Sequence, residues 1–369
     1  MHLVESQPMP KVKVDGRSVI NLCSNNYLGL ASDPRIKQAA IKAIEEYGVG
    51  STASRLVCGN STLHKELEER LARFKGTEAA LVFSCGYMAN LGIISSIVDR
   101  DALIFSDKLN HASIVDGIVL SRATLKRYPH KDMSALKRLL AQSLEQKKKL
   151  IVTDTVFSMD GDTAPLKEIV TLAKQHQGVV MIDEAHATGV FGPKGNGLAA
   201  ELGISNQIDI HMGTLSKALG AHGAYVCASK DLINFLINFS RPFIYTTALP
   251  PAIAAASIKA IDIIEQEPEL RNRLWENVKF IKDALSGLGF DTLENNSPII
   301  PLIVGNADAT MEFSTQLFNE GVFVQGIRPP TVAEGTSRLR VTVTAAHTRE
   351  DLECALERIK KTAKKLCLI

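Results

Sequence analysis

One lysine, Lys217, stands among small and apolar residues in the segment 213–220, GTLSKALG. Such surroundings remove water from a lysine amine and favour its neutral, nucleophilic form. A lysine in this setting could equally extend from a loop into solvent. Lys217 is therefore a candidate nucleophile, and the residues that accompany it decide between these two interpretations.

A carboxylate and an imidazole follow an apolar run upstream of this lysine. Residues 179–182 are apolar, and Asp183 and His186 come directly after them in the segment DEAH. Ligands of open α/β sheets bind beyond the carboxyl ends of the strands. If residues 179–182 form such a strand, both side chains belong to a binding crevice.

Three other enzyme classes are disfavoured by their missing motifs. DEAH is also a metal-binding box of helicase-type ATPases, but the chain lacks the G-x-x-x-x-G-K-[ST] segment that they need. It also lacks the G-x-S-x-G elbow of Ser/His/Asp hydrolases. Segments 48–53 and 195–200 match G-x-G-x-x-A outside a strand-to-helix context, which indicates turns rather than a dinucleotide site.

Two more polar segments follow apolar runs. Residues 84–90, SCGYMAN, lead into a helical pattern, and small residues at such a turn leave backbone N–H groups free to bind phosphate. His111 lies in the segment NHAS after the run 102–105. Each signal is weak alone, since such turns and loop histidines are common.

Short apolar runs without alternation predict strands that helices cover on both faces. Helical patterns precede and separate these runs; 34–47 and 62–74 come before the first run, the second with Glu66 as the expected capping-box partner. This alternation predicts an α/β fold with a mostly parallel, doubly wound central sheet. The expected strands are Ala79–Phe83, Ala102–Phe105, Leu150–Thr153, Val179–Ile182 and Ala224–Ala228.

The pattern of expected helices and strands divides the 369 residues into an N-terminal segment (1–30), a large α/β domain (31–264) and a smaller C-terminal α+β domain (265–369).

The net charge of +2 argues against a nucleic-acid partner. No apolar stretch approaches the roughly 18 residues of a membrane span. Six scattered cysteines without C-x-x-C or zinc spacing favour reduced thiols in the cytoplasm and no metal site.

Together these segments predict a pyridoxal 5'-phosphate site. That cofactor needs a lysine, an anion beside its ring nitrogen, a phosphate cradle and a flat group against its ring. Lys217, Asp183, the turn at 84–87 and His111 match these needs in that order.

The sequence resembles the α-oxoamine synthases, fold-type I pyridoxal-phosphate enzymes that condense an amino acid with an acyl-CoA thioester and release carbon dioxide. The resemblance spans nearly the whole chain. It implies an enzyme with the fold-type I architecture and an active site at the interface of a homodimer. The matching motifs are SNNYLGL at 24–30, NHASI at 110–114, FSMDGD at 157–162, IDEAHATG at 182–189, GTLSK at 213–217 and TVTAAH at 342–347.

The resemblance implies roles for the residues at matching positions. Lys217 would bind the cofactor aldehyde and move the substrate proton, Asp183 would face the ring nitrogen, and His111 would stack on the ring and donate to the thioester oxygen. Arg340 would bind the amino-acid carboxylate, with Asn25 near the substrate. The other implied cofactor contacts are His186 and Ser158 on the 3-hydroxyl side, Cys85, Gly86, Tyr87 and Thr214 at the phosphate, and Thr246 or Thr247 reaching the phosphate of the neighbouring subunit.

Segments 326–332 (GIRPPTV) and 342–347 look most like the members that join alanine to a pimeloyl thioester on CoA or a carrier protein. Members that join glycine to acetyl-CoA are an alternative, and a catalytically silent partner subunit is another.

The sequence departs from the family pattern at two places. Cys85 occupies a position where relatives commonly carry serine, and the chain begins close to the Asn-Asn-Tyr motif, so we expect the N-terminal helix of many relatives, with its acyl-CoA contacts, to be absent.

Overall fold

The computed structural model describes residues 1–143 and 148–369, which divide into two compact units. The large unit comprises Asp33–Phe157 and Ala164–Gln266. The small unit comprises Met1–Ser32, Ser158–Thr163 and Glu267–Ile369. The N-terminal segment and the short stretch after Phe157 thus belong with the C-terminal part of the chain, because the residues with which they pair and form hydrogen bonds lie there.

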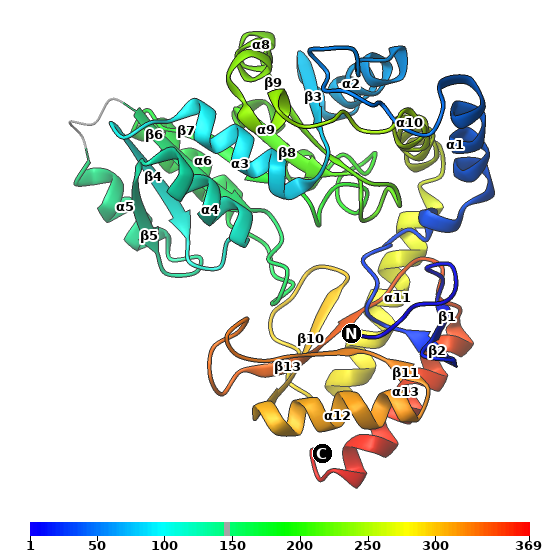
Figure 1. Cartoon of the computed structure of the whole chain (residues 1–369). Helices are drawn as coiled ribbons and strands as arrows, with labels where there is room; N and C mark the ends of the chain where they lie inside the picture. The colour runs from blue at the N-terminus through cyan, green and yellow to red at the C-terminus, as the bar shows by residue number, and fades with distance from the viewer. Residues whose placement is uncertain (144–147) are drawn as a thin grey trace. The chain divides into compact units, whose positions relative to one another are not determined.

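The large unit is built on a seven-stranded sheet with the order β3-β9-β8-β7-β6-β4-β5 (Figure 1). Only β9 runs against its neighbours, which confirms the mostly parallel α/β sheet. Its central strands are buried along most of their length, as expected when helices cover both faces. The strands are β3 (Ala79–Phe83), β4 (Ala102–Asp107), β5 (Thr124–Tyr128), β6 (Lys148–Asp154), β7 (Val179–Asp183), β8 (Ile210–Thr214) and β9 (Ala224–Ala228).

The helices of the large unit precede, connect and follow these strands. Ser61 begins one of them with a capping box whose partner is His64, so the expectation of Glu66 is wrong: the box closes at the third helical residue. The helices are α1 (Pro34–Tyr47), α2 (Thr62–Lys75), α3 (Gly86–Ile97), α4 (Ala112–Ser121), α5 (Met133–Ala141), α6 (Leu166–Gln175), α7 (Leu198–Glu201), α8 (Lys230–Phe239), α9 (Arg241–Ile244) and α10 (Pro251–Gln266).

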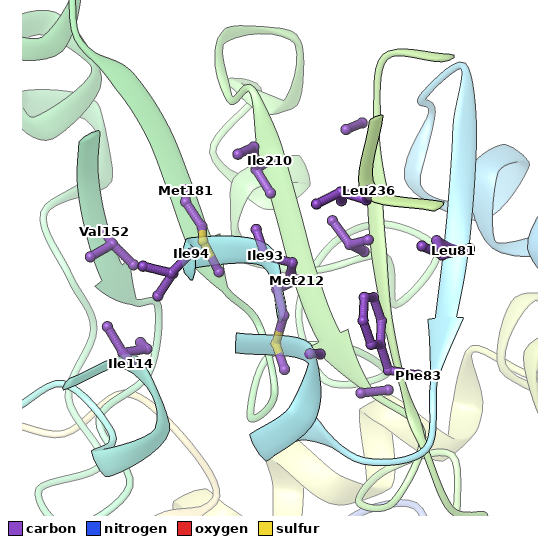
Figure 2. Packing of buried hydrophobic residues seen from close by; sticks show 14 of the residues in the cluster. Leu81, Phe83, Ile93, Ile94, Ile114, Val152, Met181, Ile210, Met212 and Leu236 are labelled. Carbon is purple, nitrogen blue, oxygen red and sulfur yellow. The ribbon is translucent and has the colours of Figure 1, made fainter. Parts of the chain in front are cut away.

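Helix α3 is fixed to the sheet by a hydrophobic cluster (Figure 2). Ile93 and Ile94 of this helix are fully buried and belong to the same cluster as Val152 of β6, Met181 of β7 and Met212 of β8. Ile114 of α4 joins this cluster, which therefore holds both helices against the sheet. Burial of each such side chain stabilises the fold by about 1.5–3 kcal/mol.

The small unit contains two three-stranded sheets, β1-β2-β11 and β10-β13-β12. The first joins the N-terminal hairpin to a distant strand, because Val322 pairs with Ile20 in parallel. The elements of this unit are β1 (Lys11–Val14), β2 (Arg17–Asn21), α11 (Glu269–Gly287), β10 (Ile299–Gly305), α12 (Ala307–Asn319), β11 (Val322–Phe323), β12 (Gln325–Ile327), β13 (Ser337–Thr342) and α13 (Arg349–Lys365).

Within the described residues, no helix combines the length and the apolar character needed to cross a bilayer. All six cysteines are free thiols.

Candidate active site

Three neighbouring strands of the large sheet each end in a buried aspartate. Asp107 ends β4, Asp154 ends β6 and Asp183 ends β7, with exposed fractions of 2 %, 6 % and 4 %. The three strands run parallel, so these carboxyl groups lie along one edge of the sheet. This is the edge at which open α/β sheets bind their ligands.

N–H groups hold both oxygens of Asp183. The main-chain N–H of Ala185 donates to its Oδ1 over 2.8 Å, and Nδ2 of Asn90 donates to its Oδ2 over 2.8 Å. Both partners are donors, which suits a carboxylate rather than a carboxylic acid. His186 follows in the same turn, with an exposed fraction of 9 %.

The same asparagine leads to His111. Nδ2 of Asn90 also lies 2.9 Å from Oγ of Ser113, which lies 2.8 Å from Nδ1 of His111. His111 is the N-cap of α4, and its ring nitrogen accepts the main-chain N–H of Ser113. A chain of hydrogen bonds thus joins Asp183 to His111. Sequence reasoning placed the two ends and missed Asn90 and Ser113.

Asp154 is a third residue that sequence reasoning missed. Its Oδ2 accepts the main-chain N–H of His111 over 2.8 Å. Burial and the charge of Asp183 raise the pKa of Asp154 well above its usual value, although the His111 N–H and the charge of Lys217 act in the opposite direction. Asp183 and Lys217 therefore both lie close enough to this carboxyl to act on it.

Lys217 lies half-buried in the loop that connects β8 to β9. The N–H of Gly220 donates to the Lys217 carbonyl over 3.0 Å, and the N–H of Ala221 donates to the carbonyl of Leu215 over 2.9 Å. These bonds fold the loop back on itself directly after the strand. The lysine is thus brought to the sheet edge that carries Asp154 and Asp183.

The turn predicted to hold phosphate is the N-terminus of α3. Cys85 is the N-cap with an extended backbone, and its side chain makes no capping hydrogen bond. The N–H groups of Gly86 and Tyr87 lie in the first turn, where an α-helix offers them no backbone acceptor. Backbone donors and the helix dipole together suit an anion at this position.

Thr214, the predicted side-chain ligand of the phosphate, is buried at the end of β8. Its hydroxyl donates to the carbonyl of Gly223 over 2.9 Å and lies 2.7 Å from Oγ of Ser216. Ser216 is the exposed member of this pair, and sequence reasoning missed it.

Thr246 and Thr247 follow α9 and lie beside the α3 turn of their own chain. Oγ of Ser84 donates to the Thr247 carbonyl over 3.3 Å, and Oγ1 of Thr246 lies 3.9 Å from Sδ of Met88. The two threonines therefore border the candidate phosphate turn.

These residues fit pyridoxal phosphate. Asp183 is held as an acceptor that suits a protonated ring nitrogen, and the uncapped N-terminus of α3 suits the phosphate. Lys217 acts electrostatically on Asp154, which is the ladder partner of Asp183, so the amine and the acid share one small region.

A second group of predicted residues meets in the small unit. Nε of Arg340 donates to the carbonyl of Ser158 over 2.6 Å, while Nη1 and Nη2 both donate to Oδ1 of Asn25 over 3.1 Å. Nη1 also donates to Oγ1 of Thr342. Residues far apart in the sequence therefore fix a nearly buried guanidinium, whose positive charge suits a carboxylate.

Arg338 takes a supporting position near Arg340. Its Nη1 pairs with Asp160, and its Nε donates to the carbonyl of Thr336 over 2.9 Å. Arg338 and Arg340 together attach the segment that begins at Ser158 to β13.

Comparisons with known proteins agree with this geometry. A family model described as aminotransferase class I and II matches residues 17–359. The chain is 53 % identical over 371 residues to an 8-amino-7-oxononanoate synthase of Citrifermentans bemidjiense, with 100 % of this chain and 95 % of that protein covered.

Two solved structures are similar over almost the whole chain. A serine palmitoyltransferase structure that contains pyridoxal phosphate has a TM-score of 0.98 at 34 % identity, with 100 % of this chain and 94 % of that chain covered. An 8-amino-7-oxononanoate synthase from Francisella tularensis has a TM-score of 0.82 at 32 % identity, with coverage of 94 % and 98 %.

Proposed function

Because the chain belongs to the aminotransferase class I and II family, we propose that it is a pyridoxal-phosphate enzyme that condenses L-alanine with a pimeloyl thioester. The products are 8-amino-7-oxononanoate, carbon dioxide and free CoA or carrier protein, a step of biotin biosynthesis. The observation that carries the proposal is the sheet edge where Asp183, held by Asn90 and Ala185, is the ladder partner of Asp154 and the loop with Lys217 follows the next strand. The choice of substrates follows the curated relatives.

The large unit supplies the groups that handle the cofactor and the proton. When bound, pyridoxal phosphate supplies an aldehyde for the lysine amine and a cationic ring that draws electrons from the substrate Cα. Asp183 holds a proton on the ring nitrogen, and Nζ of Lys217 accepts the Cα proton and later returns it. His111 would stack against the ring and would donate to the thioester oxygen, where negative charge develops.

We assign the remaining cofactor contacts by their positions in the family motifs. The N–H groups at Cys85, Gly86 and Tyr87 would bind the phosphate, and the hydroxyl of Thr214 would reach it by turning from the Gly223 carbonyl. His186 would bind the 3-hydroxyl side of the ring.

Arg340 binds the carboxylate of the amino acid. Its guanidinium is held by Asn25, Ser158 and Thr342, so little conformational entropy is lost when a carboxylate binds. Asn25 completes this subsite, because its Oδ1 already lies against both Nη atoms.

A substrate matrix tests the reaction. Alanine, glycine and serine are each combined with pimeloyl-, acetyl- and palmitoyl-CoA, and the condensation products are identified by mass spectrometry. We expect alanine with pimeloyl-CoA to give the highest kcat/KM. A preference for serine with palmitoyl-CoA, the pair that the name serine palmitoyltransferase suggests, or for glycine with acetyl-CoA, would reject the assignment.

We further propose a homodimer that works in the cytoplasm, in keeping with six free thiols. Val49, Leu56, Val57 and Tyr245 are between 53 % and 78 % exposed. The loops that carry them are joined where Ser54 pairs with Thr247. Exposed apolar residues gathered beside a ligand site are typical of an interface.

Mixed dimers test whether the active site is shared, with Thr246 or Thr247 of one subunit reaching the phosphate bound by the other. Lys217→Ala carries one defect and the double variant Thr246→Val/Thr247→Val carries another, so a mixed dimer has one site with both defects and one with neither. Sedimentation should give a dimer, and refolding the two variants together should restore activity. Mixtures no more active than the separate variants would contradict a shared site.

A further inference from the structure

Asp154 lies beside two residues of the proposed cofactor site, although no role follows for it from the family motifs. It ends β6 and is the ladder partner of Asp183 at the end of β7. Its Oδ2 accepts the main-chain N–H of His111, and its own N–H donates to Oδ1 of Asn110 over 2.9 Å. The carboxyl group therefore fixes the backbone just before α4.

The charges around Asp154 come from three elements. Asp183 on β7 and Asp107 on β4 are acidic, and Lys217 in the loop after β8 is the cation. Asp107 is occupied elsewhere, since it accepts the N–H groups of Leu109 and Lys131. Its third contact is His130, whose Nδ1 lies 3.0 Å from Oδ1.

Asp154 and Asp183 differ in their hydrogen-bond donors. Asp183 accepts one N–H on each oxygen, from Ala185 and Asn90. Asp154 accepts the N–H of His111 on Oδ2. This carboxyl group is nearly buried and lies next to the charge of Asp183. Two acids in such different environments differ in protonation state. The acid with fewer hydrogen-bond donors keeps its proton, and the other is ionised.

We propose that Asp154 is a positioning residue that carries a proton in the working enzyme. As a neutral carboxylic acid it holds the main chain of His111 and leaves Asp183 as the only anion of the pair beside the cofactor nitrogen. This inference rests on the proposed pyridoxal-phosphate function and adds a proton-holding neighbour to it.

Two substitutions separate the proton from the hydrogen bond. Asp154→Asn keeps an oxygen that can accept the His111 N–H but cannot ionise, whereas Asp154→Ala removes the acceptor. Asp209→Asn is the matched control, because this aspartate also accepts a main-chain N–H, that of Val180 over 2.7 Å, but at the amino ends of the strands. Far-UV circular dichroism checks that each variant folds.

The main measurement is the dissociation constant of pyridoxal phosphate, from fluorescence titration of each apoprotein at neutral pH. Asp154→Asn and the control should bind within about 3-fold of the wild type, and Asp154→Ala at least 10-fold more weakly. Asp154→Asn binding as weakly as Asp154→Ala would overturn the proposal, because the site would then need the anion.

A second measurement needs no alanine variant. The infrared carbonyl band of a protonated carboxyl should be present in the wild-type holoenzyme and absent from Asp154→Asn, and a wild type without this band would also overturn the proposal. Wild-type protein that binds no pyridoxal phosphate would instead refute the proposed function, so the two failures are distinguishable.

Discussion

The side-chain amide of Asn90 donates to the carboxylate of Asp183 over 2.8 Å from one turn inside α3. The same helix begins at the turn that we assign to the phosphate. One helix therefore contacts the candidate site at two places. Ile93 and Ile94 of the same helix pack in the hydrophobic cluster and hold it against the sheet. The spacing between the phosphate turn and the ring acid is thus set by a single rigid element.

Asn90→Ala should weaken cofactor binding by about 10-fold or more, because a hydrogen bond to a charged group contributes about 1.5–3 kcal/mol. The measurement is the dissociation constant of pyridoxal phosphate. Asn238→Ala is the control, since the Asn238 amide donates to a backbone carbonyl on exposed α8. Equal affinities for both variants would show that Asn90 does not support Asp183.

Lys217→Ala should abolish turnover and covalent attachment of the cofactor. Borohydride reduction of the wild-type holoenzyme should leave a stable pyridoxyl group on the peptide that contains Lys217, detected by mass spectrometry. Lys230→Ala, at the exposed start of α8, should behave as the wild type. A pyridoxyl group found on another lysine would disprove the assignment.

Arg340→Ala should raise the KM for alanine by about 10–100-fold and leave the KM for the thioester nearly unchanged. The loss corresponds to charge-assisted hydrogen bonds of about 1.5–3 kcal/mol. Steady-state kinetics with each substrate varied in turn provide the measurement. Arg349→Ala, which removes an exposed guanidinium stacked on Phe280, serves as the control. Equal increases in both KM values would argue against a carboxylate subsite.

Lys75→Met should destabilise the protein by about 3–5 kcal/mol, because it leaves the buried carboxylate of Glu184 without its cation. Glu184 directly follows Asp183 in the chain, so cofactor binding should weaken as well. Urea unfolding gives the stability, and Lys279→Met, which breaks an exposed i,i+4 pair, should change it by less than about 1 kcal/mol. Similar effects of the two substitutions would contradict the buried pair.

The same pair predicts a dependence of stability on pH. Burial opposes ionisation of Glu184, but Lys75 and His211 lower its pKa to about 2. A depressed pKa stabilises the fold above the unfolded pKa, about 4.3, and this contribution is lost as the pH falls toward about 2. Urea midpoints should therefore fall more steeply over this range in the wild type than in Lys75→Met/Glu184→Gln.

The sequence predicted five of the seven strands of the large sheet and the polar residues that follow them, because short apolar runs and the residues at their ends are local signals; β5 and β8 were not predicted. Asp183 and Lys217 were found in this way. Asn90 and Ser113 were missed, because their positions depend on how α3 and α4 pack across the sheet, and a single polar residue in a helix carries no signal of that packing. Asp154 directly follows the predicted strand Leu150–Thr153, so the local signal that found Asp183 was present for it too and was overlooked. The prediction of Glu66 as the capping-box partner was wrong, because the box pairs Ser61 with the residue three positions later, His64.

The parallel pairing of β2 with β11 has a consequence for synthesis on the ribosome. Ile20 meets its ladder partner only when Val322 has been made, so the first strands leave the exit tunnel long before their sheet can close. Contacts so distant along the chain form late and slowly. The hairpin of β1 and β2 must therefore wait through the translation of the large unit, and a nascent chain stalled before residue 322 would expose an open strand edge that invites aggregation.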